Sequence, residues 1–285
     1  MRFILCFLLC PLFVSSQSLS PERVAKIKSC TVKVLAGEKM GTGFYVDNKG
    51  TVATCWHVVF ESLKANTPIY TLTTGGKELL MSVPENLILE SLYLNAVSYD
   101  YFVLTPAKPL TQPTPFLKLG NYAALNEGQE VYTCGYPLNS EFQFVSKGIV
   151  STKYLQKKNY LQVGMVKTIK PRKESILDLT LNQGNSGGAI IKIGKTINDD
   201  EVVGIADFVI NPLGNTADSM INSAKMSQGA ISMGTIDDTG KMFGVDPSAT
   251  VVIFGQAIKA MSIGISGCIS VEYLLEGLKS LLLLK

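Results

Sequence analysis

One serine in this sequence lies in a setting that is used for covalent catalysis. Ser186 stands in the stretch LNQGNSGGAII, between Gly184 and Gly188, and satisfies the spacing G-x-S-x-G. That spacing occurs where a serine is held on a sharp turn, but glycine-rich turns with a serine are also common without any chemistry. A serine hydroxyl becomes a nucleophile only beside a base, because it is almost fully protonated at neutral pH. The next question is whether the chain supplies that base.

The chain contains a single histidine, His57, in the stretch TVATCWHVVF. It follows a predicted strand directly, at the start of what we expect to be a single helical turn. A lone histidine is more often structural than catalytic. Its unperturbed pKa near 6.5 nevertheless suits a general base. If Ser186 is activated by a histidine, that histidine can only be His57.

The order of these residues along the chain separates the candidate folds. In α/β-hydrolases, which also carry G-x-S-x-G, the histidine follows the serine, so an active enzyme of that class is excluded. Histidine, acid and then serine is the chymotrypsin-type order. Two aspartates lie between His57 and Ser186. We favour Asp100, which precedes the apolar strand of SYDYFVLTP, over Asp178, although either could be an exposed turn carboxylate.

Short strands separated by turns dominate the rest of the chain and predict an all-β barrel or sandwich. The segment 41–54 predicts a hairpin around the turn DNKG. We expect a short helix after Ser20 and a final helix from Val271, whose apolar residues repeat at helical spacing. The proline-containing segment 105–115 predicts a linker between two halves. The Met-, Ser-, Asn- and Gly-containing segment 211–261 predicts an irregular insertion that forms a mobile surface flap.

Composition limits the compartment and the partners. The first 18 residues, MRFILCFLLCPLFVSSQS, predict a signal peptide over residues 1–16 rather than a membrane anchor, because the apolar run is shorter than the about 20 residues that span a bilayer. We expect the mature chain, 17–285, to be exported. The net charge of +3, without a basic run, argues against nucleic acid as a partner. Four cysteines remain after cleavage; they permit two disulfides, or they are buried free thiols.

Three segments together resemble the trypsin-like serine peptidases, and among these the HtrA (DegP-like) branch. They are GTGFYVDNKGTVATCWHVV, DYFVL and LDLTLNQGNSGGAI. GQEVYTCGYPLNSEFQFVSKGIVS is similar to the strand pair that opens the second barrel of that branch, and GISGCISVEYLLEGL to its last strand and final helix. The resemblance covers most of the chain outside 211–261. It is a resemblance to the protease domain, with no PDZ domain after the final helix.

This resemblance implies a fold and a set of roles. The fold is two six-stranded antiparallel β-barrels, at about 22–104 and 116–285, with the active site in the cleft between them. His57 would be the general base, Asp100 its orienting acid and Ser186 the nucleophile, and the N–H groups of Gly184 and Ser186 would form the oxyanion hole. Asn185 and the absence of an Ile-Val-Gly-Gly start argue against activation by propeptide cleavage.

The resemblance also suggests which substrates are cleaved. Thr180 occupies the position six residues before the serine that is acidic in trypsin, and Ala206 is a candidate pocket wall. We therefore expect cleavage of proteins or peptides after small or apolar residues, without a metal or organic cofactor. Two alternatives stay open: a non-catalytic trypsin-fold binding protein or holdase, and a serine esterase or acyltransferase. The sequence leaves the oligomeric state open.

Overall fold

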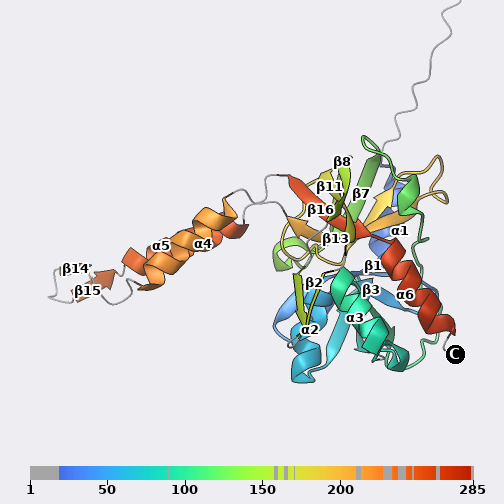
Figure 1. The fold of residues 1–285 in the computed structure, drawn as a ribbon, viewed down its shortest axis with the longest axis horizontal. Helices are drawn as coiled ribbons and strands as arrows, with labels where there is room; N and C mark the ends of the chain where they lie inside the picture. Colours follow the sequence, from blue (N-terminus) through green and yellow to red (C-terminus); the bar gives the residue numbers. More distant parts are fainter. Residues whose placement is uncertain are drawn as a thin grey trace, which may run out of the picture.

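The computed structural model describes residues 19–88, 90–156, 160–163, 166–169, 171–209, 213–226, 233–236, 242–245, 247–260 and 264–283. The predicted signal peptide, 1–16, lies outside these residues. Figure 1 shows two β-barrels packed together and a long arm that leaves them on one side. Among the described residues, no helix combines the length and the apolar character that crossing a bilayer requires.

The first barrel is closed by six antiparallel strands in the order β1-β2-β3-β6-β5-β4. Two helices and a single 3-10 turn, η1, lie in its connections, α2 between β3 and β4 and α3 between β5 and β6. The bounds are β1 Thr31–Ala36, β2 Lys39–Tyr45, β3 Val52–Thr54, α2 Trp56–Ala65, β4 Ile69–Leu72, β5 Glu78–Ser82, η1 Glu85–Ile88, α3 Glu90–Tyr99 and β6 Phe102–Pro106.

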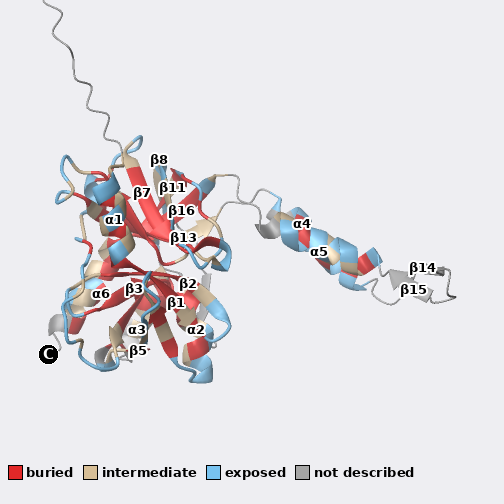
Figure 2. Ribbon diagram, turned by 180° about the vertical axis from the view of Figure 1, so that it is seen from behind, coloured by how far each residue is buried: buried red, intermediate tan, exposed pale blue. Residues whose placement is uncertain are grey.

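The second barrel is also closed, in the order β11-β16-β13-β12-β7-β8. Its strands are β7 Glu130–Gly135, β8 Phe144–Gln156, β11 Arg172–Asp178, β12 Ala189–Lys192, β13 Glu201–Val209 and β16 Ile265–Ser270. A small hairpin, β9 Tyr160–Val163 with β10 Val166–Ile169, extends the β8–β11 connection, and η2 Tyr122–Ala124 and η3 Pro137–Asn139 are 3-10 turns. The predicted fold of two six-stranded barrels is confirmed. The buried residues fill the two barrel interiors in Figure 2.

The predicted hairpin at 41–54 forms between β2 and β3, and hydrogen bonds to one aspartate stabilise its turn. The Asp47 carboxylate accepts hydrogen bonds from the backbone N–H groups of Lys49 and Thr51 and from the Thr51 hydroxyl. Gly50 closes the turn with φ of 85°, which glycine adopts without a steric penalty. This turn places β3, and with it the start of α2, in the first barrel.

Both predicted terminal helices form. Helix α1, Pro21–Cys30, begins after Ser20, whose hydroxyl accepts a hydrogen bond from the N–H of Arg23. Helix α6, Glu272–Leu283, follows β16, and Ser270 accepts a bond from the N–H of Glu272. Its buried residues Leu274 and Leu281 dock against the barrels, as the helical spacing of leucines predicts.

The structure contains more helix in the first barrel than the sequence predicts. The chain after His57 forms the ten-residue helix α2 rather than one turn, and Asn66, in the left-handed conformation, ends it. Helix α3 lies where no helix was expected; Ala96 and Val97 are buried on it. All four cysteines that follow residue 18 are free and buried, so the second of the two alternatives for them holds.

The expectation of an irregular insertion at 211–261 was wrong for the residues described there. They form helix α4 Gly214–Met226, strands β14 Met233–Ile236 and β15 Met242–Val245, and helix α5 Pro247–Ala260. The two helices lie side by side and project away from the barrels (Figure 1). Ala217, Ile221 and Ala224 are buried at helical spacing, and the Ile221 side chain lies against Gly255 of α5. The many Ser, Asn and Met residues had obscured this period.

Candidate active site

The single histidine lies in the first turn of α2, at the edge of the first barrel. Strand β3 ends at Thr54, and Cys55 is the residue before the helix. Trp56 anchors this turn, because its ring packs against the rings of Phe60, Tyr93 and Phe102 at centroid distances of 5.0–5.5 Å. The His57 side chain remains 44% exposed. The packing of its neighbour therefore fixes the backbone while the imidazole stays accessible.

Asp100 ends helix α3 and meets His57 from the opposite connection of the same barrel. Its carboxylate accepts the backbone N–H of His57 at 2.9 Å through Oδ1 and lies 2.6 Å from His57 Nδ1 through Oδ2. The backbone φ of Asp100 is 52°, a left-handed conformation in which aspartate is one of the few tolerated non-glycine residues. A carboxylate on Nδ1 assigns the proton to that nitrogen and leaves Nε2 as an acceptor.

Ser186 lies on a glycine loop of the second barrel that only glycine can build. Gly184 and Gly187 have φ of 96° and 88°, and a Cβ on either would lie 2.2 Å from a backbone oxygen, of Tyr136 and Thr42 respectively. The Ser186 hydroxyl donates a long bond of 3.4 Å to the carbonyl of Asp207. Within the described part of the chain, no hydrogen bond joins Ser186 to His57.

Asp207 and Arg172, which were not predicted as site residues, form a charged cluster beside Asp100. Asp207, on β13, has an 8% exposed side chain; its Oδ1 lies 3.9 Å from His57 Nδ1 and its Oδ2 2.8 Å from an Arg172 nitrogen. Arg172, on β11, also contacts Glu174 at 2.6 Å. A signal was present: Asp207 is the one charged residue inside the otherwise apolar stretch VVGIADFVI, where a carboxylate needs a buried partner.

The environment shifts the pKa values of the histidine and its partner in opposite directions. Burial lowers the His57 pKa, but the hydrogen bond and charge of Asp100 outweigh it and hold that pKa above 6.5. Burial raises the Asp100 pKa, but the bonds from His57 outweigh it and bring it below 3.8. The imidazolium form of His57 is therefore favoured by this geometry.

The remaining sequence candidates lie in different surroundings. Ala206 is fully buried, and its carbonyl accepts the N–H of Gly187 at 2.8 Å, which places it against the serine loop. Thr180 is exposed beyond the end of β11, with its hydroxyl near Gly264. Asp178, the alternative acid, is exposed on β11. Asp100, rather than Asp178, is therefore the aspartate that the structure brings to His57.

Four side chains here offer atoms of the kinds that bind metals. Cys55, His57, Asp100 and Asp207 place one such atom each within 4.8 Å of one another. These atoms already have partners: the Cys55 thiol donates to the Ala206 carbonyl, Asp100 bonds His57, and Asp207 pairs with an arginine. We therefore interpret the group as a hydrogen-bonded cluster and not as a metal site.

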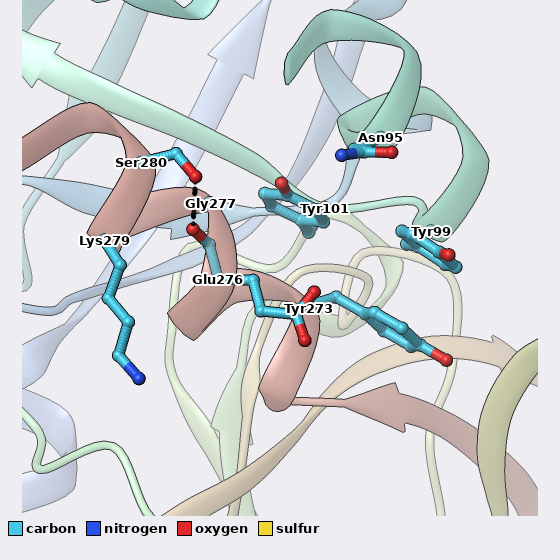
Figure 3. A pocket seen from close by; sticks show the side chains of 8 residues that line it. All are labelled: Asn95, Tyr99, Tyr101, Tyr273, Glu276, Gly277, Lys279 and Ser280. Carbon is cyan, nitrogen blue, oxygen red and sulfur yellow. Dashed lines mark hydrogen bonds between the residues drawn. The ribbon is translucent and has the colours of Figure 1, made fainter. Parts of the chain in front are cut away.

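A separate pocket opens behind Asp100, between α3 and α6, with a volume of about 330 Å³. Its walls include Tyr99 and Tyr101, the two neighbours of Asp100, and Glu276, as Figure 3 shows. Tyr99 stacks on Tyr273 with centroids 3.9 Å apart. The pocket contains no nucleophile–base pair among the described residues, so the site at His57 and Ser186 is the stronger candidate for chemistry.

Comparison with known proteins identifies the family to which this chain is similar. The model of the trypsin-like peptidase domain matches residues 41–205. An Arabidopsis thaliana protein, named among the Do-like proteases, is 30% identical over 171 residues, which are 59% of this chain and 35% of that protein. A Rickettsia conorii protein, named as a DegP-like periplasmic serine endoprotease, is 24% identical over 215 residues, 70% of this chain and 36% of that protein.

Structural comparison agrees on the fold. The HtrA-type protease AlgW, solved with a decapeptide, superposes with a TM-score of 0.52 at 16% identity, covering 91% of this chain and 66% of that one. At this identity the likeness concerns the fold alone. The chain spans about a third of the length of the two curated relatives described above.

Proposed function

This chain belongs to the trypsin-like peptidases, and we propose that it is a serine endopeptidase in which His57, Asp100 and Ser186 form the catalytic triad. The observation that carries the proposal is the pairing of Asp100 with both the backbone N–H and the Nδ1 of His57, at 2.9 and 2.6 Å. This pairing fixes the ring and its tautomer, so that Nε2 is the free acceptor that a general base needs.

The reaction follows from these positions. Ser186 Oγ attacks the scissile carbonyl carbon while its proton moves to His57 Nε2, and the imidazolium then protonates the leaving amine. Water then attacks the acyl carbon and loses its proton to the same nitrogen, and this proton returns to Ser186 Oγ as the acyl–oxygen bond breaks and the carboxylic acid product leaves. In the resting structure the Ser186 hydroxyl donates to Asp207 O at 3.4 Å. For the reaction to begin, the Ser186 hydroxyl must exchange this weak bond for one to His57 Nε2.

Two bonded carbonyls support an oxyanion hole at Gly184 and Ser186. The Gln183 carbonyl accepts the N–H of Leu138 at 2.6 Å, and the Asn185 carbonyl accepts the N–H of Gly188 at 2.9 Å. Because a trans peptide is planar, the next N–H in each case points away from the bonded carbonyl. The N–H groups of Gly184 and Ser186 donate in none of the bonds found among the described residues, so both are available to a developing oxyanion.

The substrates we propose are proteins or peptides with a small or apolar residue before the cleaved bond. The backbone of Ala206 bonds the serine loop, and neither Ala206 nor Thr180 carries a charge that would attract lysine or arginine. A peptide library cleaved by the purified protein and read by mass spectrometry tests this preference. Enrichment of lysine or arginine before the cut would contradict it.

We propose that the protein works outside the cytoplasm. The apolar segment within residues 1–16, preceded by Arg2, has the pattern of an export signal. The name of the Rickettsia conorii relative, which describes a periplasmic protein, supports the same compartment. N-terminal sequencing of the protein recovered from a cell-free extracytoplasmic fraction would locate the cleavage site. An N-terminus at Met1 in that fraction would contradict signal cleavage.

One observation favours the alternative of a non-cleaving binding protein. The Ser186 hydroxyl is engaged with Asp207 O rather than with His57, an arrangement in which the serine is not activated. The two functions differ in the reactivity of that hydroxyl. An activated serine reacts with a fluorophosphonate, whereas an unactivated one does not.

Covalent labelling therefore tests the proposed function. We expect a fluorophosphonate probe to add once to the protein, at Ser186 by peptide mapping, and to fail with Ser186→Ala and His57→Ala. Ser29→Ala is the matched control, because Ser29 is exposed on α1 and contacts no residue of the triad. Labelling of the control but not of the two triad variants supports the peptidase. No labelling of the wild type between pH 6 and 9 favours the binding protein.

A further inference from the structure

A buried carboxyl group beside Asp100 has no part in the triad described above. A carboxyl oxygen of Asp207 lies within 4.8 Å of one of Asp100, and its other neighbours are His57 at 3.9 Å and Arg172 at 2.8 Å. An ionised carboxylate is only an acceptor of hydrogen bonds. Two carboxyl groups can therefore bond each other only if one of them carries a proton.

The charges around this pair lead to the same requirement. The Arg172 guanidinium contacts Glu174 through two nitrogens at 2.6 Å, and it also contacts Asp207. With Asp100, three carboxyl groups share this one permanent cation. Full ionisation of all three would leave two uncompensated negative charges when His57 is neutral and one when it is protonated, which is costly at this low exposure. A single bound proton removes one of them.

The hydrogen bonds indicate which carboxyl holds the proton. Asp100 accepts two bonds from His57, and these favour its charged form. Burial and then the bond to Asp100 raise the pKa of Asp207 well above 3.8, although Arg172 opposes this. Asp207 is thus the protonated member of the pair, as happens when two carboxyl groups share one site.

The other titratable neighbours supply no compensating charge. Burial, followed by the charges of the two aspartates, raises the pKa of the Cys55 thiol well above 9.0. Burial and the charge of Asp207 raise the pKa of Cys268 to about 12. Tyr154 donates its hydroxyl to Glu174, and burial, followed by this bond and the charge of Glu174, raises its pKa as well. All three groups stay neutral at physiological pH.

We propose that Asp207 is a positioning residue of the triad: it carries a proton in the resting protein and donates it to Asp100, which keeps that carboxylate directed at both donors of His57. This inference rests on the proposed peptidase function. A neutral carboxyl suits the place, because its carbonyl oxygen can accept from Arg172 while its hydroxyl donates to Asp100. The amide of an asparagine has the same polarity, whereas the side chain of leucine has neither group.

Two spectroscopic measurements test the proton without any substrate. We expect the infrared spectrum of the wild type at pH 7 to contain the C=O band of a protonated carboxyl that Asp207→Asn lacks. Because His57 is the only histidine, ¹⁵N-histidine labelling reports its titration without ambiguity. If Asp207 is neutral, Asp207→Asn leaves the pKa of His57 within about half a unit of the wild type. If Asp207 is charged, losing a charge at this distance lowers that pKa by about one unit or more, which would overturn the proposal.

Kinetics test the positioning role. We expect Asp207→Leu to lower kcat by about 10- to 100-fold with little change in KM, since one buried hydrogen bond to a charged group is lost. Asp207→Asn should recover most of that loss. Asp178→Asn, an exposed aspartate on β11, is the control. Equal kcat in the Leu variant and the wild type would overturn the role. If the Leu variant does not fold, the proposal is tested by the kcat of the Asn variant and by the infrared band.

These outcomes separate this inference from the proposed function. Absence of fluorophosphonate labelling in the wild type would refute the peptidase, yet the infrared band and the His57 titration would still show whether Asp207 holds a proton. Conversely, normal labelling together with a charged Asp207 would keep the peptidase and refute the positioning role.

Discussion

Two arginines, the buried Arg23 and the partly buried Arg172, contact the second barrel in contrasting ways. Arg23, on α1, donates to Asp200 at 3.0 Å and to the Gly194 carbonyl at 2.7 Å. Asp200 also accepts from the Tyr132 hydroxyl and from the Gly194 N–H, both at 2.8 Å. One cation meets one anion, and both carboxylate oxygens are bonded. The two charges of this Arg23 cluster, formed by Arg23 and Asp200, balance each other, and the cluster lies outside the candidate active site.

The Arg172 cluster is more exposed, with His57 at 44%, and has more acids than bases. Arg172 faces Glu174 and Asp207, with Asp100 and His57 directly behind them. The comparison shows that a buried ion pair alone does not identify a functional site. A cluster with more acids than bases is a better indicator, because it must bind a proton or a positive charge to be stable. Perturbed pKa values are concentrated at functional sites for this reason. Breaking each cluster should therefore have different consequences.

The largest effect is expected from Asp100→Asn in the unbalanced cluster. The amide cannot accept a hydrogen bond at both positions that the carboxylate serves, and it favours the wrong tautomer of His57. We expect kcat/KM to fall about 10,000-fold, or about 5.5 kcal/mol in the barrier. Steady-state kinetics on a cleaved peptide measure the fall. A loss below about tenfold would mean that Asp100 does not orient the base.

The balanced cluster should respond in stability and not in catalysis. Arg23→Met leaves Asp200 buried without its cation, so we expect the free energy of unfolding to fall by about 3–5 kcal/mol. Urea denaturation measures that loss. At temperatures where the variant is folded, kcat should equal that of the wild type. A tenfold lower kcat in the folded variant would erase the distinction between the two clusters.

The pH dependence sharpens the comparison further. The pKa of His57 lies above 6.5 in the folded protein, so the acidic limb of kcat/KM should lie above pH 6.5, where the base becomes neutral. The same shift stabilises the fold fully below pH 6.5, and this stabilisation is lost as pH rises through the raised pKa. A pH profile of kcat/KM and urea titrations at pH 5.5 and 8.5 measure both. An acidic limb below pH 6.5 would contradict the assigned role of Asp100.

The smallest effect is expected when the arm is removed. Helix α4 contacts α5, and among the described residues neither makes a comparable contact with a barrel strand. We expect replacement of residues 213–260 by a short Gly-Ser linker to change Tm by less than about 4 °C. Labelling of Ser186 should persist, because the Arg172 cluster is built on barrel strands. Loss of labelling in a folded variant would show that the arm supports the site.

Much of this molecule could be predicted from the sequence, for identifiable reasons. One histidine and one G-x-S-x-G limited the pairings, the chain order was of the chymotrypsin type, and the resemblance to trypsin-like peptidases implied two barrels. Asp100 could be chosen because an acid before an apolar strand must lie near a barrel edge. The hairpin around Asp47 and the helix after Ser20 carry local signals, so they formed as expected.

The pairing of Arg172 with Asp207 was not predicted, because it depends on a contact between residues that are distant in sequence. Arg172 and Asp207 lie on β11 and β13, which are separated by β16 in the barrel, and no local pattern joins them. Their pairing depends on the strand order, which the spacing of the residues does not contain. The helices of the arm were missed for a different reason. Small polar residues lower the contrast between their buried and exposed faces, so the period was weak.

The strand order of the second barrel has a consequence for the life of a newly made chain. Synthesis proceeds from the N-terminus, so the whole first barrel, with His57 and Asp100, is complete before the second begins. Strand β16 is the last of the six strands of this barrel to be made, and it lies between β11 and β13. A ribosome-bound chain that lacks β16 therefore has His57 and Asp100 in place but cannot close the barrel that carries Ser186. The proposed active site would be complete only after this strand has been made.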